Sequence, residues 1–485
     1  MPKLKSIISS EVLSHRGLCV DFEGFLDKIE DMIGRKEVKK IVNLALKESK
    51  ADQVEVNIFN YDQALTRFAN NYIHQNVNES NTSISVRAIF GKKIGSASTN
   101  SLDPKKIKET VKWAEQIAQF QKENPDFRSL PRIKSKDYHK IKTYVEKTAR
   151  FSNIERANAV AKIVNVAKKY SLTAYGSVSN GVAEICIGNS LGTFAYAVCD
   201  DVFCNIVMSG SNSTGYIQAG ARDIAKIDFS ALAEIAMKKA LTSANPIELT
   251  PGKYTTIFEP LAASEFLDYL GYYAFNGKLF QEGRSYLTGR LGSKIVDEWI
   301  TIIDDPYNKT GFSFAFDFEG VPKKRFVLIN KGVAKNVVYD SLTASRAKKK
   351  STGHALTPPN PFGPVPLHLS MKAGDKGLDE MISATEKGIL VTRFHYTNVV
   401  DPHKLIFTGM TRDGTFLIED GKITKGLKNL RFTENIIEAL NRLDVISKDA
   451  VLVASEPGYG GRFATGNIVP AMKIKDFTFT SATKF

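Results

Sequence analysis

The sequence has few cysteines and no long apolar run, and both shortages narrow the class of protein. Its 485 residues include four cysteines, none of them in a C-x-x-C pair: Cys19, Cys186, Cys199 and Cys204. Four thiols spread in this way are too few for a disulfide framework and fit a reducing compartment. No apolar run approaches the ~18–20 residues that cross a bilayer. The basic N-terminal residues are not followed by the apolar stretch of a secretory signal. We therefore expect a cytoplasmic protein without a membrane span.

Histidine is also scarce, and this restricts the metal sites that the chain can build. No histidine lies between His139 and His354, and no cysteine follows Cys204. A catalytic zinc needs about three protein ligands besides a position for water. The histidines of the C-terminal half do not have the spacing of a helix-borne pair, so structural roles are the simpler interpretation. A metal site around His354, His395 and His403 is kept as an alternative.

Positive charge is what the sequence has in excess. The net charge is +14 and the pI is about 9.3. A basic balance favours an anionic partner such as nucleic acid, a membrane surface or an acidic protein. The lysines are scattered, however, and the densest cluster, Arg346 to Lys350, is short and lies in a turn-like stretch. A nucleic-acid-associated regulator is therefore an alternative and not the expected function.

The N-terminal part predicts a repeated order of helix, strands and helix. The first pass has helices over residues 36–48 and 103–119, and the second has helices over 153–169 and 228–241. Each pass holds four short strands, expected at residues 53–60, 63–68, 73–78, 82–90, 173–179, 183–188, 193–199 and 203–209. Asp103 and Asp228 suit helix N-caps and, when matched, offset the passes by roughly 125 residues. Antiparallel strands flanked by helices predict an α+β fold with an internal duplication.

The C-terminal part begins with a strand at residues 254–258 and a helix that starts at Pro260. Its apolar face holds Ala262, Phe266, Tyr269 and Leu270, and three polar side chains are expected off that face: Ser264, Glu265 and Asp268. Short strand-like segments after residue 295 predict a mainly antiparallel β domain, with a late helix at 433–443. Residues 351–366 hold five prolines and are expected to be irregular. We divide the chain into a lead-in (1–35), an N-terminal α+β domain (36–245) and a β-rich C-terminal domain (246–485).

Several stretches resemble the TldD/PmbA (TldD/TldE) family of metallopeptidases. RFANNYIHQN at residues 67–76 is similar to a signature of the family's first half. SEFLDY at 264–269 stands where the zinc-binding branch has H-E-x-x-x-H. Similar stretches of the second half are FEGVP at 318–322, TGHA at 352–355, GILVTR at 388–393 and GMTRDGTFLIEDG at 409–421. The resemblance covers roughly residues 37–482 and implies the family's two-domain fold.

The resemblance also predicts that the zinc site is missing from this chain. The motif positions hold Ser264, Glu265 and Tyr269, so the glutamate is present and both histidines are absent. The family's last ligand is a cysteine near the C-terminus, and here no cysteine follows Cys204. Hydroxyl groups do not replace neutral imidazoles on zinc. We therefore expect no metal and no cofactor in this chain, with zinc only in a partner subunit, and its catalytic residues stay unknown.

The branch without the motif, TldE/PmbA, implies a subunit that completes the chamber of a peptidase for unfolded or extended peptides. Its partner would be a zinc-binding TldD-like subunit, or a second copy in a homodimer. Main-chain hydrogen bonds would hold the peptide as an added strand. The candidates for the substrate groove or the interface are Arg67, Asn70, His74, Gln75, Asn76, His354, Arg393 and His395. In residues 67–76, a hairpin whose amides satisfy local turns is the competing interpretation. A self-sufficient metallopeptidase with a different metal site is the second alternative.

Overall fold

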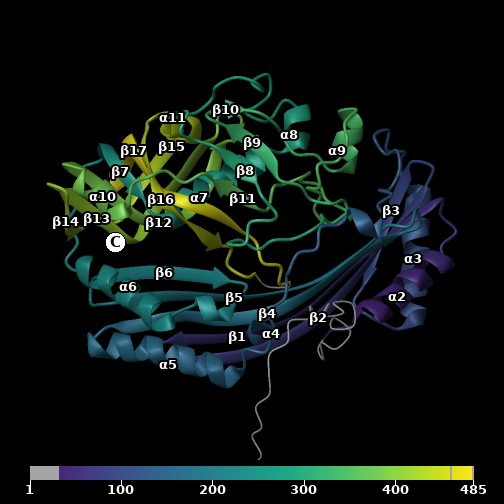
Figure 1. The fold of residues 1–485 in the computed structure, drawn as a ribbon, viewed down its shortest axis with the longest axis horizontal. Helices are drawn as coiled ribbons and strands as arrows, with labels where there is room; N and C mark the ends of the chain where they lie inside the picture. The colour runs from purple at the N-terminus through teal and green to yellow at the C-terminus, as the bar shows by residue number, and fades with distance from the viewer. Residues whose placement is uncertain (1–31, 459–460, 483–485) are drawn as a thin grey trace, which may run out of the picture.

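Two β-sheets, one in each half of the chain, form the framework of the protein (Figure 1). The computed structural model describes residues 32–458 and 461–482. The long strands of the N-terminal sheet run across the lower part of Figure 1, and the C-terminal sheet lies above them. The predicted α+β fold with two domains is confirmed. The lead-in, residues 1–35, falls almost entirely outside the described residues.

The N-terminal sheet has six antiparallel strands in the order β3-β2-β1-β4-β5-β6. They are β1 (Gln53–Ala69), β2 (Tyr72–Phe90), β3 (Lys93–Thr99), β4 (Thr173–Asn189), β5 (Phe194–Ser209) and β6 (Thr214–Ala221). The prediction of eight short strands was wrong, because pairs of them are single long strands. Tyr61 and Asp62 looked like a turn, but they pair with Ala183 and Val182 of β4 in unbroken register. Hydrogen bonds from both neighbouring strands thus keep polar residues extended in a central strand.

Four helices cover one face of this sheet in two pairs. α2 (Arg35–Glu48) and α3 (Pro104–Phe120) pack on β1 to β3, and α5 (Asn153–Lys169) and α6 (Phe229–Thr242) pack on β4 to β6. Asp103 caps α3 by accepting from the Lys105 N–H, and Asp228 caps α6 in the same way. The order of helix, three strands and helix therefore occurs twice, and the first strands of the two passes, β1 and β4, pair at the centre.

The C-terminal sheet has eleven strands and is mixed. They are β7 (Gly252–Phe258), β8 (Ile302–Asp304), β9 (Phe326–Asn330), β10 (Val333–Ala334), β11 (Leu369–Met371), β12 (Lys387–Asp401), β13 (Ile406–Glu419), β14 (Lys422–Gly426), β15 (Leu430–Asn435), β16 (Leu443–Ala454) and β17 (Gly466–Ala482). The expected antiparallel pairing dominates, but β7 runs parallel to β12 and β11 runs parallel to β17. Strand β17 also pairs with β7, so β17, β15, β13, β12 and β7 close into a ring.

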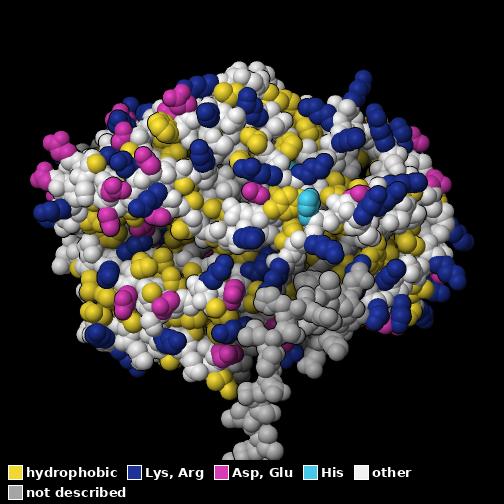
Figure 2. Space-filling model, viewed as in Figure 1, with side chains coloured by type: hydrophobic (Ala, Val, Ile, Leu, Met, Phe, Trp, Pro, Cys, Tyr) yellow, Lys and Arg dark blue, Asp and Glu magenta, His cyan; other side chains and the backbone are white. Residues whose placement is uncertain are grey.

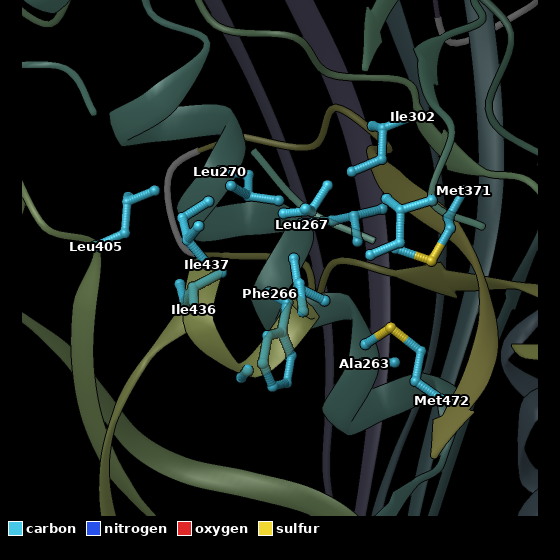
Figure 3. Close-up of a cluster of buried hydrophobic side chains, with 14 of the residues drawn as sticks. Ala263, Phe266, Leu267, Leu270, Ile302, Met371, Leu405, Ile436, Ile437 and Met472 are labelled. Atoms are coloured by element: carbon cyan, nitrogen blue, oxygen red, sulfur yellow. The ribbon is translucent and has the colours of Figure 1, made fainter. Parts of the chain in front are cut away.

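Helix α7 (Pro260–Tyr269) lies in the core that this sheet builds. Its Phe266 contacts the rings of Phe258, Phe394, Phe407 and Phe477, and none of these side chains is open to solvent by more than a few per cent. Figure 3 shows α7 side chains meeting residues of distant segments: Ala263, Phe266, Leu267 and Leu270 with Ile302, Met371, Leu405, Ile436, Ile437 and Met472. The polar face of α7 is therefore held in a fixed position.

The remaining helices of this half are short. After α7 the chain makes a π turn, η3 (Leu270–Ala274), and then α8 (Gly277–Gln281), α9 (Ser341–Arg346), α10 (Leu378–Ser383) and α11 (Ile436–Asn441). The late helix expected at 433–443 was too long. Residues 430–435 alternate between buried and exposed as strand β15, and Asn435 then caps α11. None of the helices in the described part of the chain is long and apolar enough to span a bilayer.

Candidate functional site

The polar face of α7 carries the residues at the zinc-motif positions, and the first of them is buried. Ser264 is 4% exposed, and its hydroxyl accepts a hydrogen bond from the Asn467 side chain at 2.9 Å. Asn467, on β17, also donates to Asp268 at 2.7 Å. The expectation that Ser264 lies on a solvated edge was wrong, because β17 packs over that face of the helix. One amide therefore ties α7 to the last strand of the sheet.

Glu265 and Tyr269 lie towards β12 instead. The Glu265 carboxylate accepts a hydrogen bond from the Thr397 hydroxyl at 2.9 Å. Burial raises the pKa of Glu265, and the Thr397 hydrogen bond and the nearby Arg393 charge oppose that rise. The ring of Tyr269 stacks on Tyr273 at a centroid distance of 6.1 Å, and burial raises the pKa of its hydroxyl. Ser264 is thus hydrogen-bonded to β17 and Glu265 to β12, while the ring of Tyr269 packs on η3 and β13.

Asp268 lines a small pocket of about 50 Å³ beside α7. The pocket is closed by η3 and by the loops that precede β11 and β17, and its lining includes Tyr272, Pro366, Ser455 and Thr465. The surrounding protein raises the pKa of Asp268, while its hydrogen bond from Asn467 opposes the rise.

A larger groove of about 590 Å³ lies between the N-terminal sheet and the loop that joins β16 to β17. Among the predicted candidates, Arg67 and Gln75 line it, and Asn70, His74 and Asn76 do not. Its other walls come from β1, β2, β4, β5 and the loop, with Gln63, Val77, Glu79, Ser177, Asn205 and Glu456 among the lining residues. Polar and apolar side chains both line the groove, which suits an extended peptide that presents main-chain groups and side chains together.

The hairpin between β1 and β2 explains why only some of the predicted candidates in residues 67–76 line the groove. Asn70 and Asn71 both have positive φ, 51° and 66°, and form its two-residue turn. The chain reverses there, so residues 67–69 end β1 and residues 72–76 begin β2. The side chain of Asn71 bonds the Leu172 carbonyl and the Ala174 N–H, while Asn76 accepts from Thr66. These amides satisfy local structure, as the competing interpretation proposed.

Two side chains hold the loop that forms one wall of the groove. Neither contact could be predicted from the sequence. Arg462 makes two hydrogen bonds to the Asp201 carboxylate, at 2.8 and 2.7 Å, and both residues are buried. Glu456 accepts from the Asn205 amide at 3.0 Å. Each contact joins residues more than 250 positions apart. The C-terminal loop is thereby fixed on the N-terminal sheet.

Known proteins resemble this chain in both halves. The model described as PmbA/TldA metallopeptidase C-terminal domain matches residues 251–481, and the one described as PmbA/TldA metallopeptidase domain 1 matches residues 54–118. Together these two matches cover more than half of the chain. The chain belongs to the PmbA/TldD metallopeptidase family.

Individual relatives are distant. A metalloprotease of Methanothermobacter thermautotrophicus is 28% identical over 230 residues, which are 46% of this chain and 50% of the relative. A TldD homologue of Haemophilus influenzae is 23% identical over 423 residues, 81% of this chain and 86% of that protein. The chain spans about half the length of the curated relatives that it matches first. TldE from Thermococcus kodakarensis has the same fold, with a TM-score of 0.82 at 21% identity over 92% of this chain and all of that one.

The zinc site that the PmbA/TldD family implies does not fit the residues of this chain. Ser264 and Tyr269 offer hydroxyl groups where imidazoles are needed, and Ser264 is already hydrogen-bonded in a buried contact. Within residues 32–458 and 461–482, no group of three or more His, Cys, Asp or Glu side chains is placed to hold a metal. No reaction step can therefore be routed through zinc at this position.

The other predicted candidates lie in three separate surroundings. His354 is 1% exposed and bonds Asp304 at 3.1 Å, which favours a structural role. Arg393 pairs with Asp413 and places its guanidinium 3.9 Å from the centre of the Tyr216 ring, so it joins the two domains. His395 lies on β12 against Tyr396, and partial burial and the neighbouring arginines lower its pKa.

Proposed function

We propose that this chain is a TldE/PmbA-type subunit of a TldD/TldE-type peptidase, and that it does not itself activate water. A zinc-binding TldD-like subunit is the partner, and unfolded or extended peptides are the substrate. Membership of the metallopeptidase family supports the reaction class, and the fold shared with a TldE supports the subunit type. The cytoplasm stays the expected compartment, since Cys186, Cys199 and Cys204 are free and buried.

The observation that carries the proposal is the hydrogen bond between Asn467 and Ser264. A zinc-binding relative needs an imidazole at this position, with its nitrogen open to the metal. Here a small hydroxyl is enclosed between α7 and β17, and it accepts a hydrogen bond from the amide of Asn467. Position 264 therefore has a structural role and presents no side chain suited to bind zinc.

The substrate-holding role rests on the groove and on the edge of β2 beside it. Strand β3 pairs only with residues 84–90 of β2. Residues 72–83 of β2 have no strand neighbour on that side within the described part of the chain, and Gln75, Val77 and Glu79 of this stretch line the groove. A free edge offers unpaired N–H and C=O groups to an extended peptide.

Zinc content and peptide hydrolysis test the proposal directly. The purified chain is measured alone and then mixed with a zinc-binding relative from the same organism, with an unfolded polypeptide as substrate. We expect no stoichiometric zinc and no hydrolysis from the chain alone, and hydrolysis from the mixture. Hydrolysis by the pure chain that a chelator abolishes would contradict the proposal and favour a separate metal site.

A matched pair of variants tests the groove. Gln75→Trp adds bulk at an exposed position of the groove, and Gln119→Trp makes the same change at an exposed position of α3. We expect the first variant to raise the KM of the mixture for polypeptide several-fold and the second to leave it unchanged. An equal effect of both variants would remove the groove from the substrate path.

A further inference from the structure

The segment between α3 and α5 carries a ribbon of unpaired positive charge. Residues 128–142 contain six exposed cations that form no ion pair with any described residue: Arg128, Arg132, Lys134, Lys136, Lys140 and Lys142. The only acidic side chain in the ribbon is Asp137. Two hydrogen bonds attach the ribbon to the rest of the protein. The Leu130 N–H donates to the side chain of Gln53, and the Tyr138 hydroxyl donates to the Gly320 carbonyl. Its cations are therefore left facing outward.

The ribbon leads to a second feature that the proposed function does not use. The ring of His139 contacts the ring of Tyr307 at 4.8 Å between centroids. Next to Tyr307 opens a groove of about 1010 Å³ over the outer side of β8, β9 and β11. The apolar side chains of Ile303 and Val327 line it, and Trp299 stands beside them with 69% of its surface exposed.

The groove is also basic. Arg325, Lys331 and Lys372 line it. Two further lysines are exposed nearby: Lys309 lies two positions after Tyr307, and Lys324 follows Lys323, whose carbonyl accepts a hydrogen bond from the Tyr307 hydroxyl. Its two acidic side chains each have a basic neighbour: Glu298 lies 3.8 Å from Lys294, and Asp305 lies 3.6 Å from Arg325. We call the ribbon and these five cations the basic track. Figure 2 shows Lys and Arg side chains gathered across the middle and right of this face of the molecule.

We propose that the basic track binds a single-stranded nucleic acid. Cations arranged in a line favour the binding of a phosphate backbone, because binding releases the counterions condensed on the nucleic acid. Aromatic faces between the cations offer stacking surfaces for unpaired bases, which contribute about 1–3 kcal/mol per base. An acidic protein would be attracted by the same charges, but it has no flat base to place on Trp299. The aromatic groups therefore favour nucleic acid over an acidic protein, and unpaired bases over a duplex.

The test is fluorescence anisotropy of the full chain with a labelled 20-nucleotide single strand, as DNA and as RNA, between 50 and 200 mM salt. The track variant is Lys134→Glu, Lys136→Glu and Lys140→Glu. Its control reverses three equally exposed lysines on α5 and α6: Lys162, Lys168 and Lys238. Both variants change the net charge equally. Because all six side chains are exposed, the two variants should show the same unfolding midpoint as the parent chain.

We expect the parent chain to bind with a steep salt dependence. Losing three phosphate contacts lowers the slope of log K against log salt by about 2, since each contact on a single strand contributes about 0.7. At 100 mM salt the track variant should bind at least tenfold more weakly and the control within about twofold of the parent. Trp299→Ala should weaken binding by fivefold or more.

Three results would overturn the proposal. The first is no binding at 50 mM salt, and the second is an equal loss in the track and control variants. The third is displacement of the strand by poly-glutamate of equal charge combined with unchanged binding by Trp299→Ala, which would assign the track to an acidic protein. None of these readouts depends on zinc or on peptide hydrolysis, so the proposed peptidase role stands or falls separately.

Discussion

The contact between Arg462 and Asp201 gives the sharpest test of how the groove is built. The two buried side chains share two charge-assisted hydrogen bonds, and the Asp201 carboxylate has no other hydrogen-bond donor from a side chain among the described residues. Arg462→Met keeps an unbranched side chain and removes the guanidinium with its charge. Both carboxylate oxygens of Asp201 are then left in a buried place without a partner.

The expected cost follows from that unpaired charge. Breaking a buried pair on one side costs about 3–5 kcal/mol, whereas replacing both partners by apolar groups is often neutral. Arg462→Met should therefore destabilise the contact by about 3–5 kcal/mol, a factor of roughly 10² to 10³·⁵ in the opening equilibrium of the loop. The double variant with Asp201→Leu should recover at least about 2 kcal/mol of that loss.

Native-state hydrogen exchange of the loop between β16 and β17 measures this opening directly. A two-domain chain can unfold in more than one step, so a local readout is sharper than a global midpoint. Lys106→Met is the control, because Lys106 forms only a solvent-exposed pair with Glu109, and such pairs contribute little to stability. A loss below about 1 kcal/mol for Arg462→Met, or no recovery in the double variant, would refute the reasoning.

Three further predictions concern the fold. Phe266→Ala empties the centre of the aromatic core and should cost about 3–5 kcal/mol in urea unfolding, whereas Phe120→Ala, at a side chain 90% exposed, should cost almost nothing. Asn71→Ala removes two hydrogen bonds to the backbone at the start of β4, and it replaces a residue type that tolerates positive φ. We expect the free energy of unfolding to fall by about 1–3 kcal/mol and proteolysis of the hairpin to become faster. Burial lowers the pKa of His368 to about 3, so its stabilisation is complete above the unfolded value of about 6.5 and is lost as pH falls towards 3. His368→Gln should flatten the fall in unfolding midpoint over that pH range, and the same change at exposed His403 should not.

Local chemistry let the sequence predict the helices well. Asp103, Asp228 and Pro260 start α3, α6 and α7 within a residue of the expected positions. Strand length was mispredicted because it depends on neighbours: Asp62 reads as a turn residue, but β4 holds it extended. The late helix was overextended because Thr433 belongs to β15, where the adjacent strands β13 and β17 decide the conformation.

The candidate site, like the fold, could be predicted from the sequence only in part. The zinc-motif positions were assigned through the resemblance to the family, whose motif follows a strand and lies on the next helix. Asn467 could not be found, because the sequence shows nothing that relates it to Ser264 some two hundred positions earlier. The groove depends even more on long-range contacts, since its wall is set by Arg462 and Asp201. A buried ion pair between domains leaves no periodic pattern in either segment.

These long-range contacts argue that two histidines would not by themselves rebuild the family's zinc site in this chain. An imidazole at position 264 would have to displace the amide of Asn467, which also holds Asp268. Since β17 is the strand that closes the ring with β7, its position cannot shift without disturbing that closure. Ser264→His with Tyr269→His would therefore supply two imidazoles on a helix whose polar side chains already contact β17 and β12. The third ligand would still be absent, because the strand that faces Ser264 offers an amide there. In this chain the polar face of α7 contributes to holding the sheet together.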